Sequence, residues 1–125
     1  MPDIVYSVNA TLSKGALSQQ FVAAGVTADC NASGLSTQTL TPGTNAAGTA
    51  AISTASLTSA GLFFARNLST VSTAAVSFGQ LSGGLLVPTV ALRGGEAAVG
   101  RLAAGSYAAQ ANLTGTQLVI TIVEG

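Results

Sequence analysis

Apolar and polar residues alternate along much of this chain with a period of two. In residues 4–12 every second side chain is apolar: Ile4, Tyr6, Val8, Ala10 and Leu12. Polar side chains such as Asn9 stand between them. Alternation of this kind is typical of a β-strand with one buried face. The final segment, residues 117–123, shows the same pattern, so both segments are predicted to be half-buried strands.

Gly-rich turns separate further short apolar segments at intervals of about ten residues. We predict strands within residues 16–29, 36–40, 50–57, 61–68, 71–78, 85–92, 97–102 and 106–113. Pro88 has no N–H to donate to a sheet, which places its segment at a sheet edge or a bulge. Gly79 is expected to end a strand, and Thr114–Gly115 is expected to form a hairpin turn. The fold class predicted is all-β, an antiparallel β-sandwich or jelly-roll-like domain of about 8–10 short strands.

The chain is organised around residues 61–68, which contain two of the four Phe residues side by side. Neighbouring residues of a strand point to opposite faces, so Phe63 and Phe64 cannot share one side. One is expected to enter the core, and the other needs a second cover from another sheet or another subunit. We expect a single β-sandwich domain over residues 1–125. Residues 1–60 form its looser half, with a strand that can link subunits, and residues 61–125 form the core sheet.

The surface of this protein must be poor in charge. Charged residues make up 6% of the chain and the formal net charge is zero, against about 25% charged residues in an average domain. A net charge near zero promotes association. There is no basic patch for phosphate contacts and no run approaching the ~18 apolar residues of a membrane span, so neither nucleic acid nor a membrane is an expected partner. Cys30 is the single cysteine, which excludes an internal disulfide and favours a small buried apolar role.

The residue types that carry most enzyme chemistry are scarce. The chain has no His, which removes His-based nucleophilic triads and the usual transition-metal ligands. Glu96 and Glu124 are a conceivable acid–base pair for a glycoside, but carbohydrate sites usually use aromatic platforms and the chain has no Trp. Residues 43–49 have the glycine spacing of a phosphate-binding loop, with Thr49 where Lys is needed. We therefore expect no enzymatic activity, no cofactor and no metal site.

The few charges near apolar segments suggest an assembly role instead. A charge in such a setting usually needs a partner, and one hypothesis is that Arg66 or Arg101 pairs with Glu96 across a subunit interface. The alternative is that each side chain extends to water from a sheet edge. With Phe63 and Phe64, these three residues are our candidate interface residues.

The second half of the chain resembles small β-sandwich structural proteins of tailed bacteriophages. The resemblance rests on residues 61–68 (GLFFARNL), residues 76–79 (VSFG), residues 92–96 (LRGGE), residues 107–111 (YAAQA) and the closing residues 118–125. It covers roughly residues 50–125 and includes no catalytic residue. It implies a virion component, most directly a capsid decoration (cement) protein. Such a protein sits on the outer capsid surface, binds the major capsid protein, stabilises the shell, and is commonly a homotrimer.

Other classes of function remain open from the sequence. Another virion module, such as a head fibre or a neck or tail component, would use the same sandwich. A host-glycan-binding module would need an exposed aromatic platform, for which Tyr6 and Tyr107 are the candidates; both lie in alternating segments where burial is expected. A bacterial adhesin or surface-layer repeat is a further alternative, and an enzyme is the most remote.

Overall fold

The structure is a computed structural model that describes residues 3–29, 34–45, 48–54, 57 and 60–124. Over these residues the chain forms ten β-strands and no α-helix. By its internal contacts it divides into two compact units, Met1–Asn31 and Ala32–Gly125. The sequence predicts a single β-sandwich over residues 1–125. In the structure the sandwich strands all belong to the second unit, because the two N-terminal strands pair only with each other.

The first unit is a long hairpin, which we call the arm. It consists of β1 (Ile4–Lys14) and β2 (Leu17–Ala28), paired antiparallel. Gly15 and Ala16 connect the strands, and the positive φ of Gly15 (57°) at the first turn position suits a type II′ hairpin turn.

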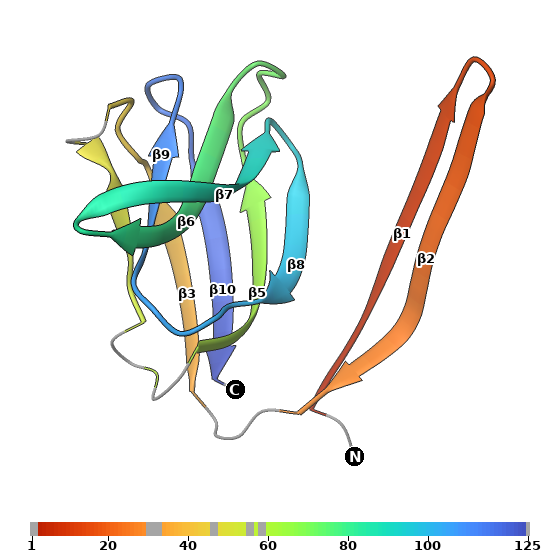
Figure 1. Ribbon diagram of the computed structural model, residues 1–125, viewed down its shortest axis with the longest axis horizontal. Coiled ribbons are helices and arrows are strands. Elements are labelled where there is room, and N and C mark those ends of the chain that lie inside the picture. The colour runs from red at the N-terminus through yellow and green to blue at the C-terminus, as the bar shows by residue number, and fades with distance from the viewer. Residues whose placement is uncertain (1–2, 30–33, 46–47, 55–56, 58–59, 125) are drawn as a thin grey trace. The chain divides into compact units, whose positions relative to one another are not determined.

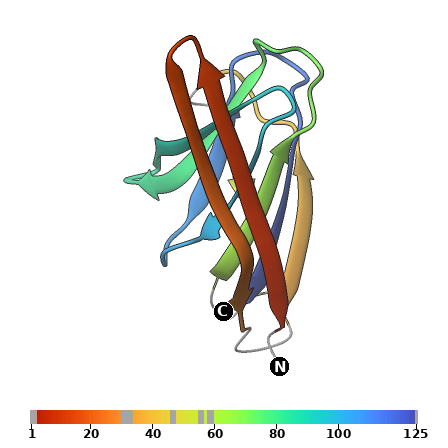
Figure 2. The ribbon, with the colours of Figure 1, turned by 90° about the vertical axis from the view of Figure 1, so that its right-hand side faces the viewer.

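A bulge interrupts the arm near its open end. The register shifts after the pair of Tyr6 and Val26, so that β2 has one residue more than β1 at this point. Gly25 accommodates the bulge with a φ of 63°, and its N–H donates to Ser7 Oγ at 3.1 Å. Bulges bend a strand pair and increase its twist, and the ribbon curves in this region (Figures 1 and 2).

The second unit contains eight strands in the residues that the structure describes, and we call it the sandwich. They are β3 (Leu35–Leu40), β4 (Ala50–Ile52), β5 (Ala60–Asn67), β6 (Ala75–Ser82), β7 (Leu85–Arg93), β8 (Ala97–Arg101), β9 (Tyr107–Ala111) and β10 (Leu118–Glu124). They form two four-stranded sheets. The first sheet has the order β3-β10-β5-β8 and the second β4-β9-β6-β7.

The pairing follows a jelly-roll pattern. The first strand of the sandwich pairs with the last, β3 with β10, and the pairs β4–β9, β5–β8 and β6–β7 are nested inside it. The sandwich is therefore a long antiparallel ribbon folded at the β6–β7 turn and wound so that alternate pairs fall in different sheets (Figure 1). This is the arrangement of a double Greek-key jelly roll. The predicted all-β, sandwich or jelly-roll fold is confirmed.

The core lies between the two sheets. Alternate residues of β10, with those of β5, β6 and β9, supply it: Phe63, Ala65, Val76, Phe78, Tyr107, Ala109, Ala111, Leu118, Ile120 and Ile122. Phe63 and Phe78 come from opposite sheets, and their rings pack edge to face with centroids 5.5 Å apart. This geometry is favourable for two aromatic rings and joins the sheets at the middle of the core.

Two details of the predicted strand pattern differ in the structure. Gly79 does not end its strand: β6 continues to Ser82, and the register shifts at Gly79 where β7 carries one extra residue. A side chain at Gly79 would collide with the Val87 carbonyl oxygen, so the glycine reflects a close backbone approach. Pro88 lies opposite Gly79 on β7, an edge strand. The prediction of an edge or bulge is confirmed there.

The second difference concerns the turn before the last strand. Thr114 and Gly115 lie between β9 and β10, but these strands are in different sheets, so the turn crosses between sheets and does not close a hairpin. Of the strand predicted over residues 50–57, the described residues form β4 (Ala50–Ile52), and residues 55 and 56 lie outside the described residues. Cys30, expected to be buried, lies outside the described residues.

Candidate functional site

The two adjacent phenylalanines of β5 point to opposite faces, as predicted. Phe63 is 6% exposed and belongs to the core, whereas Phe64 lies on the outer face of the first sheet and is half-buried. Its cross-strand neighbours are Thr121 on β10 and Val99 on β8. The first sheet therefore has an apolar residue at the centre of both faces.

Arg66 and Arg101 lie on this same outer face. Arg66 is opposite Ala97, and Arg101 is opposite Leu62, so the two guanidinium groups stand four positions apart along the β5–β8 pair. Both residues are exposed. An antiparallel sheet normally carries polar and charged residues on its solvent face. Here half-buried Phe64, Val99 and Thr121 occupy the row between the two arginines, and half-buried Val119 is opposite Arg66.

Glu96 lies in the tight turn between β7 and β8. Its Oε1 accepts a hydrogen bond of 2.6 Å from the backbone N–H of Arg93, and its backbone carbonyl accepts one of 3.0 Å from the N–H of Asn67. The side chain is exposed and stabilises its own turn. The pairing of Glu96 with an arginine of another subunit stays a prediction.

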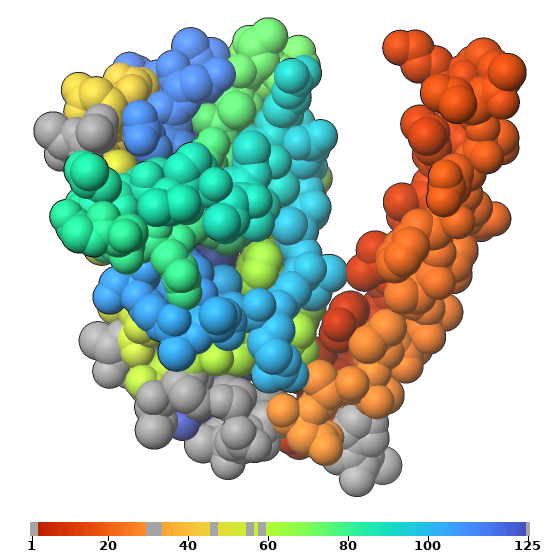
Figure 3. All heavy atoms as spheres, viewed as in Figure 1, coloured from red at the N-terminus to blue at the C-terminus, as the bar shows by residue number. Residues whose placement is uncertain are grey.

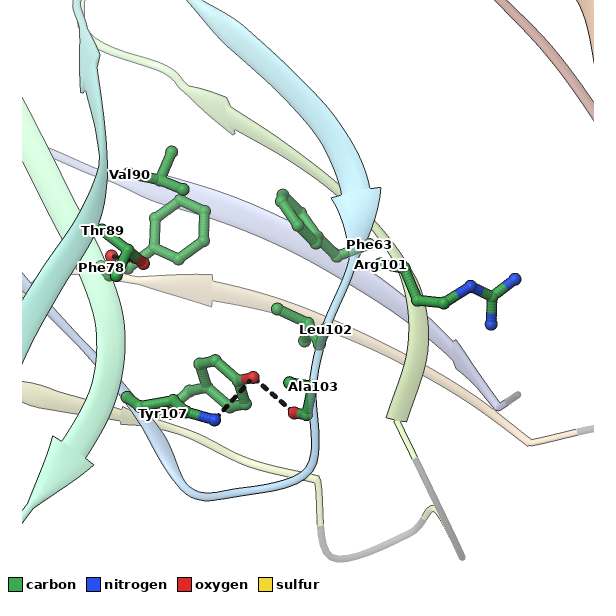
Figure 4. A pocket seen from close by; sticks show the side chains of 9 residues that line it. Phe63, Phe78, Thr89, Val90, Arg101, Leu102, Ala103 and Tyr107 are labelled. Carbon is green, nitrogen blue, oxygen red and sulfur yellow. Dashed lines mark hydrogen bonds between the residues drawn. The ribbon is translucent and has the colours of Figure 1, made fainter.

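A cavity of about 290 Å³ opens at one end of the sandwich. Figure 4 shows its lining: the Phe63 and Phe78 rings, Val90 and Leu102 face the space, while the Arg101 side chain points away from it. Ligand pockets of small molecules are usually at least this large, and they present a few polar groups ready to orient the ligand.

The polar groups of this cavity are already engaged. Gln80 Nε2 donates to the carbonyl oxygen of Ala104 at 2.9 Å and to Tyr107 Oη at 3.3 Å, and the Tyr107 hydroxyl donates to the carbonyl oxygen of Ala103. Tyr107 is 6% exposed, as expected from its alternating segment, and provides no exposed platform for a sugar ring. The cavity can accommodate an apolar group but holds no acid, base or nucleophile poised to react.

One face of the arm is apolar, and the described residues of its own unit contribute no further strand to cover it. Residues paired across the two strands point to the same face. One face is mostly apolar, and we call it the apolar face of the arm: Ile4, Tyr6, Val8, Ala10, Leu12, Leu17, Phe21, Ala23, Val26 and Ala28. Near the turn this face also includes Lys14, opposite Leu17, and Gln19, opposite Leu12. The opposite face is mainly hydroxyl and amide side chains. The hairpin is a single layer of two strands, and no other described strand of its own unit covers either face (Figure 3).

Exposure on the apolar face increases toward the turn of the arm. Ile4, Tyr6, Val8 and Val26, near the open end, are half-buried. Leu12, Phe21 and Leu17, near the turn, are 52%, 61% and 62% exposed. An isolated two-stranded hairpin is at best marginally stable in water. The tip of the arm is therefore a surface suited to contact with another structure.

The side chain of Asn67 connects loop residues to strands of the sandwich, a role that is not among the predictions made from the sequence. Asn67 is fully buried: its Nδ2 donates to the carbonyl oxygens of Ala74 and Leu92, at 3.1 and 2.9 Å, and its Oδ1 accepts from the N–H of Ser69 at 2.9 Å. Because Leu92 belongs to the second sheet, this amide connects the two sheets. The sequence signal was an Asn within an apolar segment, where burial requires full hydrogen bonding.

Comparison with known proteins gives no relative: no family model, no curated protein and no solved structure matches this chain. Among the described residues there is no cluster of three or more His, Cys, Asp or Glu side chains that could hold a metal ion. In the same part of the chain no helix has the length and apolar character needed to cross a membrane.

Proposed function

We propose that this chain is a non-enzymatic structural protein of a virion, and specifically a capsid decoration protein that binds the outside of the major capsid shell and stabilises it. The observation that carries the proposal is the combination of a self-sufficient jelly-roll sandwich with an arm that cannot bury its apolar face within its own unit. Such an arm needs a surface outside its own unit, and an assembly can provide one.

The surface composition supports the same function. A protein that spends its working life packed in a shell needs contact area more than charge, and this chain has eight charged residues in 125. The edge strands β3, β8, β4 and β7 leave backbone groups available for pairing with a neighbour. The resemblance of residues 50–125 to bacteriophage structural proteins points to the major capsid protein as the partner.

The test is binding to shells assembled from the major capsid protein of the phage that carries the chain. The purified chain is mixed with these shells, and the pellet after sedimentation is analysed for stoichiometric, saturable binding. Decorated shells should also melt at a higher temperature than bare shells, because a ligand that binds only the assembled state stabilises it. A chain that stays in the supernatant at tens of micromolar, with no change in shell melting, contradicts the proposal. A neck or tail protein would leave shells bare and bind purified neck or tail complexes instead.

A further inference from the structure

We propose that the cavity between the two sheets of the sandwich binds an uncharged, apolar small molecule of the size of one or two aromatic rings. The cavity has a volume of about 290 Å³. Its lining comes from both sheets, because Phe63 belongs to the first sheet and Phe78 to the second. This inference concerns a ligand site inside the sandwich and does not depend on the proposed assembly function.

The cavity lies where a glycine and a bulge take the place of regular core packing. Gly100 is opposite Phe63 in the β5–β8 pair, and a Cβ at Gly100 would stand 3.1 Å from the Phe63 ring. β8 therefore adds no side chain to the core at this position. In the other sheet, the register shift beside Phe78 leaves Thr89 as an extra residue of β7. Bulges redirect side chains, and here Thr89 and Val90 line the cavity.

The opposite side of the sandwich is closed, so the cavity is a local feature and not a general separation of the sheets. Gln38 of β3 makes two hydrogen bonds to the backbone of Ser53, which directly follows β4. Its Nε2 donates to the Ser53 carbonyl oxygen at 2.6 Å, and its Oε1 accepts from the Ser53 N–H at 2.9 Å. This amide joins the edges of the two sheets at β3 and β4. The cavity lining comes instead from the edge strands β7 and β8 on the other side.

The lining favours an uncharged ligand. Four apolar side chains face the space, whereas the Arg101 guanidinium points away from it (Figure 4). No Asp or Glu is among the described residues that line the cavity. Gln80 Nε2 and the Tyr107 hydroxyl already donate to backbone carbonyl oxygens. A buried water needs about two to four polar partners, and the apolar wall offers none. An apolar molecule is therefore a better occupant than water.

The volume of the cavity sets the size of the ligand. An apolar cavity of ~150 Å³ lined by Leu, Ile and Phe side chains stays dry and binds benzene. This cavity is about twice as large, so it has room for a two-ring aromatic or a branched hydrocarbon of about ten carbons. The Phe63 and Phe78 rings already pack edge to face, with centroids 5.5 Å apart. A ring of the ligand can extend this packing, which favours an aromatic molecule.

Toluene and benzoate are suitable probes, because they have nearly the same shape and differ in charge. Each is titrated into the full-length chain with ¹³C-labelled Val and Leu methyl groups. Toluene should shift the methyl resonances of Val90 and Leu102 and show NOEs to them, with a Kd on the order of 1 mM. Benzoate should bind at least about 10-fold more weakly, because burial of its carboxylate is unfavourable. Absence of toluene-dependent shifts at these methyl groups, or equally tight binding of benzoate, overturns the inference.

Val90→Trp and Ala91→Trp provide matched variants that test the location of the site. Val90 is half-buried and faces the cavity, whereas the adjacent Ala91 is exposed and points to the other face of β7. The chain has no Trp, so the fluorescence of each variant reports one indole. Val90→Trp should emit at a shorter wavelength than Ala91→Trp, because its ring fills the cavity away from water.

The same two variants should differ in toluene binding. Val90→Trp is expected to weaken it at least about 10-fold, and Ala91→Trp to leave the parental affinity unchanged. Parental affinity in a Val90→Trp variant whose emission shows a buried indole overturns the inference. If Val90→Trp does not fold, the toluene and benzoate titrations of the parent chain decide the question.

Discussion

Replacement of Asn67 by Ala should destabilise the sandwich more than any other single amide replacement at its loops. The side chain makes three hydrogen bonds, to Ala74, Leu92 and Ser69, and is fully buried. Each hydrogen bond contributes about 1 kcal/mol net, and a buried backbone group that loses its hydrogen bond adds a desolvation penalty. The free energy of unfolding should therefore fall by about 3–5 kcal/mol. A domain of this size has a stability of about 5–15 kcal/mol, so the loss is a large fraction of the whole.

Asn112→Ala is the matched control. The Asn112 side chain makes two hydrogen bonds: its Oδ1 accepts from the N–H of Ala75 at 2.7 Å, and its Nδ2 donates to the carbonyl oxygen of Thr73 at 2.8 Å. Asn112 is exposed, so water can replace its side chain, and the expected loss is about 1 kcal/mol or less.

Urea denaturation followed by circular dichroism measures both variants. For an m-value of about 1.5 kcal/mol/M, the midpoint should fall by about 2–3 M for Asn67→Ala and by less than about 1 M for Asn112→Ala. The m-values should remain equal, which shows that the native fold is kept. If Asn67→Ala loses no more stability than Asn112→Ala, the role assigned to burial is wrong.

Three further predictions test the fold. Asn67→Asp introduces a buried carboxyl whose pKa is raised by desolvation, so the variant should be closest to the parent chain below about pH 4 and lose stability as the pH rises to 7; an equal gap in urea midpoint at both pH values contradicts this. Gly79→Ala should lower the free energy of unfolding by more than about 2 kcal/mol, because its Cβ meets the Val87 carbonyl oxygen. Gly83→Ala should lower it by about 1 kcal/mol, because its Cβ has open space and only the φ of 60° is unfavourable. Equal melting temperatures of the two variants would refute the collision at Gly79. Phe63→Ala should cost about 3–5 kcal/mol through loss of core packing, and a urea midpoint within 1 M of the parent value would show that the edge-to-face pair matters little.

Period-two alternation was enough to predict the fold class, because it depends only on which side chains face the core. It identified residues 4–12 and 117–123 as strands. Turn residues delimited the strand at 61–68, and adjacent Phe63 and Phe64 required two faces for it. It could not show that the apolar side of residues 4–12 belongs to a separate arm. A strand of the sandwich and a strand of a separate hairpin have the same alternation.

Local sequence signals gave wrong predictions at two places where the conformation is set by residues that are distant along the chain. A Gly after an apolar segment predicts the end of a strand, but Gly79 lies within β6 and lets its backbone approach that of β7 closely. This constraint is set by Val87, eight positions away. Thr114 and Gly115 have the composition of a hairpin turn, but the nested pairing of the jelly roll sends β9 and β10 to different sheets. Among the candidate interface residues, Phe63 proved to be a core residue, while Phe64, Arg66 and Arg101 share one outer face.

The most direct test of an assembly role is the solution mass of the purified full-length chain, measured by light scattering after size exclusion. One chain has a mass of 12.1 kDa. A homotrimer, the state that the resemblance to capsid decoration proteins implies, has three times that mass, about 36 kDa, and should persist on dilution to low micromolar concentration. A mass of 12.1 kDa at all concentrations, with the arm intact, would contradict the account.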